Sequence, residues 1–283
     1  MDIYVNARRS FPIAGFGFLV LAGWAAVFPA RAEDGYRPVV LARKEWGEYR
    51  ARLAGKEETR WKAKWVLETA DTTPPFLYHI RDEAAGTFGP DNLKLSKTTE
   101  AEFILDRGEI RMVRGVCTIR DDAGTALKIL QATFDEAKNA VAVHTSYPGR
   151  EKEETEKFDP GGKVVETKEV VSFLRGFPFQ EGGKLDFEML TDKPTTYSIQ
   201  ATYEGEETVT VPAGTFVCHK VRLAPDLGIL TFIGKIIAPD LYFWFTAQPP
   251  HFWVKFEGPD GERGAHDIVS ELVSFNAATS ERE

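Results

Sequence analysis

Apolar and polar side chains alternate one by one along most of this chain from Trp61 onward. The clearest case is the stretch TYSIQATY, in which Tyr197, Ile199, Ala201 and Tyr203 alternate with polar residues. A period of two places successive side chains on opposite faces of a β-strand, so one set enters a core and the other meets solvent. The pattern therefore predicts a protein built mainly of β-strands.

Turn motifs separate the apolar stretches. They are Asp106-Arg107-Gly108, Asp122-Ala123-Gly124, Pro160-Gly161-Gly162, Glu204-Gly205 and Pro259-Asp260-Gly261. Many short strands joined by tight turns indicate an antiparallel meander. We expect strands at 61–68, 93–105, 110–119, 126–134, 141–147, 163–168, 184–190, 196–203, 208–211, 215–223, 241–245, 252–257 and 267–275.

Two segments depart from the period of two. Leu41, Trp46, Tyr49 and Leu53 have roughly helical spacing and Gly55 follows them, which predicts a helix over 39–53. A second, short helix is expected at 170–175, as a crossover or plug.

These elements predict four parts in the chain. A signal peptide at 1–32 precedes a helical lead-in at 33–60. A single antiparallel β domain follows at 61–275, within the usual size of one barrel or sandwich, and a flexible tail occupies 276–283. The mostly acidic run at 150–157 is interpreted as a solvated loop.

The first 32 residues contain the parts of a secretory signal. Arg8 and Arg9 precede an apolar run at 11–28, and the triplet Ala30-Arg31-Ala32 matches the pattern before a signal-peptidase cut. We expect cleavage after Ala32 and no lipid anchor, because no Cys lies at the cut. The alternative is an uncleaved membrane anchor, for which the run is near the lower length limit.

Cleavage predicts a periplasmic protein, with secretion as the second choice, and no transmembrane span in the mature chain. The stretch Arg8-Arg9-Ser10-Phe11 matches half of a twin-arginine motif, so both export routes stay open. Without residues 1–32 the chain keeps 32 basic and 42 acidic residues, a net charge of −10. This balance, without basic clusters, argues against nucleic acid or anionic lipid headgroups as the main partner.

The sequence contains no recognisable catalytic or metal-binding motif. The five histidines (His79, His144, His219, His251 and His266) show no ligand spacing, so no metal and no cofactor are expected. There is no Gly-x-Ser-x-Gly elbow and no phosphate-binding glycine loop. No catalytic residue is assigned, and an enzyme is unsupported.

The two cysteines, Cys117 and Cys218, both fall in expected strands. An oxidising compartment would allow a disulfide between them. Two buried thiols are the alternative, because a bond requires α-carbons within about 7 Å of each other.

The stretch at 227–245 (LGILTFIGKIIAPDLYFWF) is apolar on both faces. Lys235, Pro239 and Asp240 argue against a membrane-spanning helix. One interpretation is a segment buried on both sides, and another is an apolar flap at a cavity mouth or a docking patch. The resulting ligand-contact candidates are Leu230, Phe232, Ile236, Tyr242, Trp244 and Trp253.

The stretch VTVPAGTFVCHKV at 209–221 resembles a signature of the exported bacterial family called domain of unknown function 3108. The resemblance extends over about 61–275. It implies an antiparallel curved sheet or half-open barrel of about ten or more strands, similar to periplasmic lipoprotein carriers that hold acyl chains. The hairpin residues are Val211, Pro212, Ala213, Gly214, Thr215, Phe216 and Cys218.

The hairpin also has a purely structural interpretation. Pro212 has no backbone N–H to donate to a neighbouring strand and should end the first strand. Gly214 allows the backbone to reverse direction. The signature could therefore be turn chemistry without a catalytic meaning.

Three functions remain open at this point. The first is a non-enzymatic binder of a lipid or other apolar molecule, favoured by an aromatic content of 12% with 20 Phe and by the implied fold. The second is a structural or protein-interaction module of the cell envelope. The third is a hydrolase of envelope glycans or lipids.

Overall fold

The computed structural model describes residues 35–138, 140–150, 152–158, 163–167, 169–190, 195–225, 240–260 and 266–277. The chain divides into two units, Met1–Ala32 and Glu33–Glu283, and all described residues belong to the second. The expected signal segment, including Ala30 and Ala32, lies outside the described residues.

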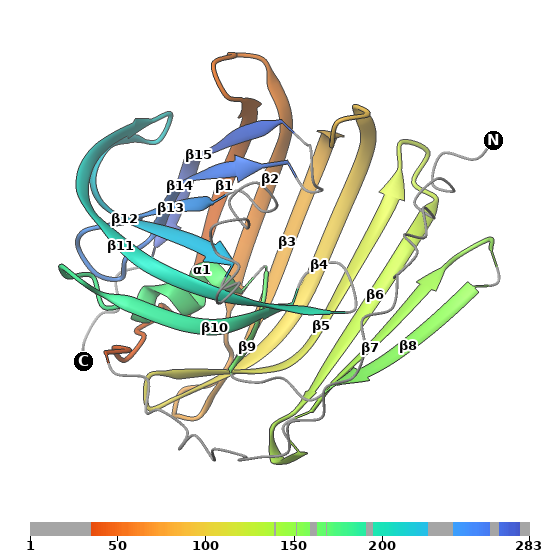
Figure 1. Ribbon diagram of the computed structural model, residues 1–283, viewed down its shortest axis with the longest axis horizontal. Helices are drawn as coiled ribbons and strands as arrows, with labels where there is room; N and C mark the ends of the chain where they lie inside the picture. Colours follow the sequence, from red (N-terminus) through yellow and green to blue (C-terminus); the bar gives the residue numbers. More distant parts are fainter. Residues whose placement is uncertain are drawn as a thin grey trace, which may run out of the picture. The chain divides into compact units, whose positions relative to one another are not determined.

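Fifteen strands of the described residues form one sheet (Figure 1). Their bounds are β1 Lys44–Leu53, β2 Thr59–Glu68, β3 Phe76–Phe88, β4 Leu93–Asp106, β5 Glu109–Asp121, β6 Ala126–Asp135, β7 Ala140–Tyr147, β8 Lys152–Phe158, β9 Val164–Glu166, β10 Lys184–Leu190, β11 Thr196–Val211, β12 Gly214–Pro225, β13 Leu241–Thr246, β14 Trp253–Pro259 and β15 Asp267–Ala277. The helical turns are η1 Glu136–Lys138, α1 Val170–Phe173 and η2 Leu174–Gly176. None of them could reach across a bilayer.

The sheet has two arms that meet at its middle. Strands β1 to β8 follow one another as a meander, and strands β15 back to β9 form the other arm. The antiparallel pair of β1 and β15 joins the arms, and among the described strands only β9 and β10 pair in parallel. Strands β8 and β9 are the two open edges, so the expected open antiparallel sheet is confirmed.

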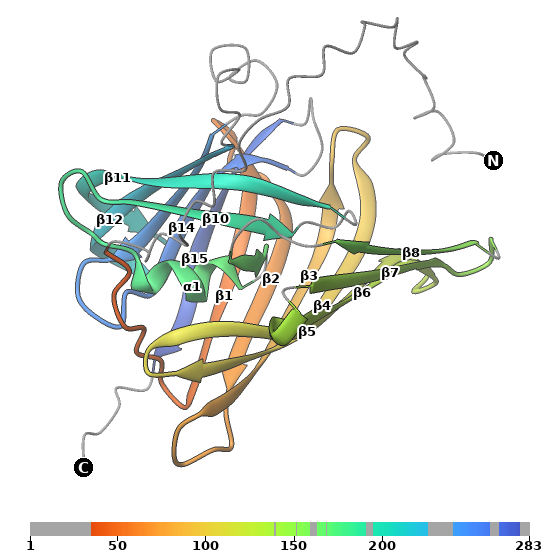
Figure 2. The same cartoon turned by 60° about the horizontal axis from the view of Figure 1, so that its bottom comes forward.

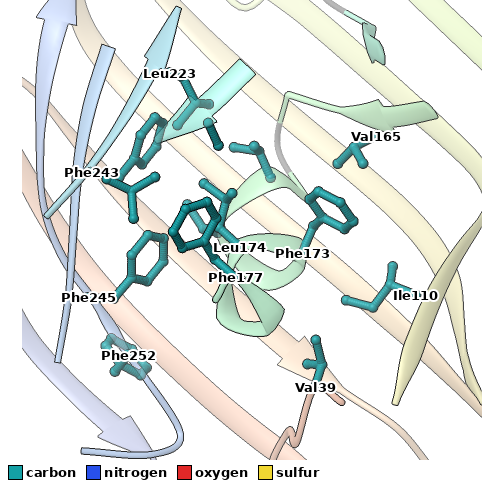
Figure 3. Packing of buried hydrophobic residues seen from close by; sticks show 14 of the residues in the cluster. Val39, Ile110, Val165, Phe173, Leu174, Phe177, Leu223, Phe243, Phe245 and Phe252 are labelled. Carbon is teal, nitrogen blue, oxygen red and sulfur yellow. The ribbon is translucent and has the colours of Figure 1, made fainter. Parts of the chain in front are cut away.

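The two helical turns α1 and η2, which we call the plug, pack on part of the inner face of the curved sheet (Figure 2). We define the inner face as the one that carries the buried side chains Tyr49, Trp65 and Leu67. Phe173 and Leu174 of the plug are fully buried there. Figure 3 shows Leu174 on the side of Phe243 and Phe245 of β13, and Phe173 on the side of Val165 and Ile110. The short helix expected at 170–175 is thus confirmed, and it packs inside the sheet.

One edge of the sheet lies against the inner face of the other arm. Leu190 of β10 packs in a small cluster with Leu130 and Val143 of β6 and β7. Glu166 of β9 approaches Gly115 of β5 so closely that an added Cβ would lie 1.9 Å from its carboxylate. Gly115 therefore permits this close contact.

The helix expected over 39–53 is wrong, because residues 44–53 form strand β1. Glu45, Gly47, Tyr49 and Ala51 point inward, and the residues between them point outward. The alternation of inward and outward residues could not be recognised in the sequence, because a carboxylate (Glu45) and a glycine (Gly47) occupy inward positions where apolar side chains are expected. Within the helical lead-in expected at 33–60, residues 44–53 form β1 and residues 59–60 begin β2.

Two other expectations at the sheet ends are corrected. Residues 150–157 were expected to form a loop, but β8 begins at Lys152 and pairs with β7 along its length. The position of β8 at the edge of the sheet explains why a strand carries so many charged residues, since charged side chains on edge strands discourage pairing with further strands. The expected tail at 276–283 begins within β15, which continues to Ala277.

Candidate functional site

Three of the six predicted ligand-contact residues are described. Leu230, Phe232 and Ile236 lie outside the described residues. Tyr242 and Trp244 are on β13, and Trp253 begins β14.

Tyr242 and Trp244 point away from the inner face. Along β13 they alternate with Phe243 and Phe245, which pack in the core around the plug. The ammonium group of Lys220 lies 4.8 Å from the Tyr242 ring centroid and 4.9 Å from that of Trp244.

Trp244 is also fixed on its other sides. The indole N–H donates to Glu207, and Lys255 lies 4.5 Å from the ring centroid. Only 1% of Trp244 is exposed, so its contacts are with protein side chains.

Trp253 links β14 to the middle of the sheet. Its ring stacks on Tyr49 at 4.1 Å, and the Tyr49 hydroxyl donates to the Trp253 carbonyl at 2.9 Å. Burial raises the pKa of Tyr49 well above its ordinary value, so the phenol stays protonated. The geometry gives Trp253 a packing role.

A buried ion pair anchors the plug to the sheet. Arg175 of η2 donates from Nη1 to Glu45 of β1, at 2.8 and 3.0 Å from its two oxygens, and the side chains are 1% and 0% exposed. The guanidinium lies 5.7 Å from the Trp65 ring centroid and 5.4 Å from that of Phe252. These rings provide the apolar part of its surroundings.

A second part of the inner face carries apolar side chains that are only half covered. Trp61 of β2 stacks on Phe88 of β3 at 5.7 Å. Trp61 is opposite Gly86 of β3, and Gly86 is opposite Leu95 of β4, so Trp61 and Leu95 point to the same side of the sheet. Ile119 of β5 points to this side as well. Trp61, Leu95 and Ile119 are half-buried. We call Trp61, Phe88, Leu95 and Ile119 the inner apolar patch.

The outer face of the same strands is charged. A groove of about 750 Å³ crosses β1 to β4 there. Its outward side chains are Glu48, Arg50, Lys62, Lys64, Glu83, Ser96 and Thr98. Cross-strand pairs such as Lys64 and Glu48, 3.9 Å apart, are typical of a solvated face.

Two histidines that are distant in sequence, His219 and His251, come together around Phe179. The His219 ring stacks on Phe179 at 4.4 Å, and the His251 ring lies 4.8 Å from it. The Tyr203 hydroxyl is 3.2 Å from Nδ1 of His219, and Glu206 is 3.4 Å from the same atom. Burial lowers the pKa of both histidines. Among the described residues no cluster of three His, Cys, Asp or Glu could hold a metal ion.

Cys117 and Cys218 are both thiols in the structure, so the disulfide alternative is not formed. Cys218 is buried on β12, and burial raises the pKa of its thiol to about 12. At neutral pH this cysteine is protonated and is a poor nucleophile.

The hairpin signature forms the turn between β11 and β12. β11 ends at Val211, β12 begins at Gly214 with a φ of +136°, and Pro212 and Ala213 lie between them. The Ala213 N–H donates to the Leu272 carbonyl at 3.1 Å, and Phe216 packs on Phe275 at 5.9 Å. Pro212 ends the first strand as predicted, and the tip docks on β15.

These observations define a class of protein: a single open antiparallel sheet curved around a short helical plug, with an apolar inner face. Within this class, the chain belongs to the family described as "Protein of unknown function (DUF3108)", whose model matches residues 116–263. The resemblance expected from the hairpin signature is confirmed. No curated protein matches the sequence.

Two solved structures are similar to this chain at low sequence identity. A beta-barrel-like protein of domain of unknown function DUF1849 from Brucella abortus is 11% identical, with a TM-score of 0.52 over 84% of this chain and 99% of that chain. A putative exported protein with a YmcC-like fold from Bacteroides fragilis is also 11% identical, with a TM-score of 0.36 over 85% and 98% of the two chains. The first similarity supports the fold alone.

Proposed function

We propose that this protein is a periplasmic, non-enzymatic binder of an apolar ligand, held on the inner apolar patch. The observation that carries the proposal is that Trp61, Leu95 and Ile119 are only half-buried, whereas Tyr49, Trp65 and Leu67 on the same face are buried. Incompletely covered apolar surface on a curved sheet is typical of ligand sites. The secretory signal expected at 1–32 supports the location.

A fluorescence titration tests the proposal. The dye N-phenylnaphthylamine, which is neutral and apolar, should bind the mature protein and be displaced by hexadecanol. Leu95→Gln places an amide in the patch and should weaken dye binding by roughly tenfold, which corresponds to the burial of one leucine side chain.

Ser96→Gln is the matched control, because Ser96 is the next residue of β4 and points to the outer face. It should leave the dye affinity unchanged. The proposal fails if wild-type protein does not bind dye or alcohol, or if both variants have the same effect.

A second candidate is a structural or protein-interaction module of the envelope. It is favoured by the packed interior around the plug, where Phe173, Leu174 and Phe177 are fully buried. Native mass spectrometry after mild extraction separates the two candidates: a bound lipid supports the binder, and one stoichiometric protein partner without lipid supports the module.

A further inference from the structure

Two lysines flank the inner apolar patch on the same face. Lys97 of β4 is opposite Ile119 of β5, and Ile119 is opposite Lys128 of β6. Directly opposed residues of antiparallel strands lie about 5 Å apart and point to the same side. Both lysine side chains are therefore within reach of one point above Ile119.

These positions are unusual for lysine. The neighbouring inward residues on the same strands, Thr99 and Leu130, are 0% and 2% exposed. Lys97 and Lys128 themselves are half-buried. Partial burial of an ammonium group loses hydration, which nearby aromatic or anionic groups must offset.

Phe88 provides part of this compensation for Lys97. The Lys97 ammonium lies 4.6 Å from the centroid of the Phe88 ring, and that ring also stacks on Trp61. The charge of Lys97 therefore lies directly beside the inner apolar patch. A ligand that covers the patch would bring its polar end close to this ammonium group.

We infer that the ligand is an amphiphile with an anionic headgroup, such as a carboxylate or a phosphate, held between Lys97 and Lys128 with its chain on Trp61, Phe88 and Leu95. The inference rests on the proposed function and adds the chemical class of the ligand. The net charge of −8 for the whole chain disfavours an anionic surface as a partner. A pair of lysines on one concave face can still bind a single anion.

Competition against bound N-phenylnaphthylamine tests the inference, with palmitate and hexadecanol as probes of equal chain length. Palmitate should bind roughly tenfold more tightly than hexadecanol, as expected for charge-assisted hydrogen bonds in a partly buried site. Lys97→Gln and Lys128→Gln should each remove most of this difference and leave hexadecanol binding unchanged. Lys97→Arg should retain the preference.

Lys62→Gln and Lys64→Gln are the matched controls, because both residues lie on β2 and point to the outer face. They should keep the preference for palmitate. Equal binding of palmitate and hexadecanol, or a preference that survives in the Lys97→Gln/Lys128→Gln double variant, overturns the inference but leaves the proposed function standing. Absence of binding by both probes overturns the two together.

Discussion

His219 and His251 share a buried environment in which a positive charge is disfavoured. Their ring centroids are 5.6 Å apart. For His219, burial is the main cause of the lowered pKa and His251 adds to it, whereas Glu206 acts in the opposite direction. For His251, burial is again the main cause, and Arg175 and Arg37 lower the pKa further.

The lowered pKa values predict acid sensitivity. The unfolded chain should bind protons at these histidines near the usual pKa of 6.5, before the folded protein does. The stability that the two neutral imidazoles contribute is thus present above about pH 6.5 and is lost as the pH falls toward the lower folded values. Urea midpoints measured between about pH 7 and pH 5 should decrease.

Substitution distinguishes these two histidines from the other titrating groups. His219→Gln/His251→Gln should flatten the decrease in urea midpoint, even if it lowers the midpoint at neutral pH. His144→Gln is the comparison variant and should leave the decrease in place, because the His144 side chain is 38% exposed and its polar partners in the described chain are the surface residues Thr155 and Glu153. An unchanged pH slope in the double variant contradicts the prediction.

Lys97 and Lys128 show why the candidate site was only partly predictable from sequence. The strands that contain them were predicted, at 93–105 and 126–134. Which side each lysine faces depends on strand pairing and on bulges, one of which falls between Ile119 and Arg120. A bulge changes the phase of the alternation, and a single sequence does not reveal it.

At the scale of elements, the plug formed by α1 and η2 depends on one buried charge pair. Removal of Arg175 leaves the Glu45 carboxylate buried without its cation. Arg175→Ala should therefore lower the free energy of unfolding by roughly 3–5 kcal/mol, measured by urea denaturation.

Arg114→Ala is the control for this prediction. Arg114 pairs with Glu102 on the outer face, where its side chain is 59% exposed, and its loss should cost under about 1 kcal/mol. Equal effects of the two substitutions would show that the plug does not depend on the buried pair.

Strands with uniform alternation were predicted well, and those with inward polar residues were not. Residues 184–190 were assigned with the bounds that β10 has, because Leu185, Phe187 and Met189 alternate with charged residues. Strand β3 was missed: Asp82 faces inward in its middle and interrupts the apolar set. A charged residue can occupy an inward position of a sheet only when residues elsewhere in the chain stabilise it. The local sequence pattern does not show these partners, so strands with inward charges are missed.

At the scale of the whole molecule, the export signal remains a prediction with a direct test. Protein recovered from the periplasm should begin at Glu33, as measured by intact mass. Ala32→Phe should block the cut, because signal peptidase requires a small residue there. Ala25→Leu, within the apolar run, should be cleaved normally. A full-length or cytoplasmic product of the wild-type gene contradicts the prediction.

The pairing of β1 with β15 has a consequence for the time at which the sheet can form. A chain that emerges N-terminus first, from a ribosome or through a membrane pore, presents β1 more than two hundred residues before its partner β15. Contacts so distant in sequence form slowly. Until β15 is available, no strand pair among the described strands joins the two arms by hydrogen bonds. The order of strands therefore delays completion of the fold until the C-terminal strand has been released.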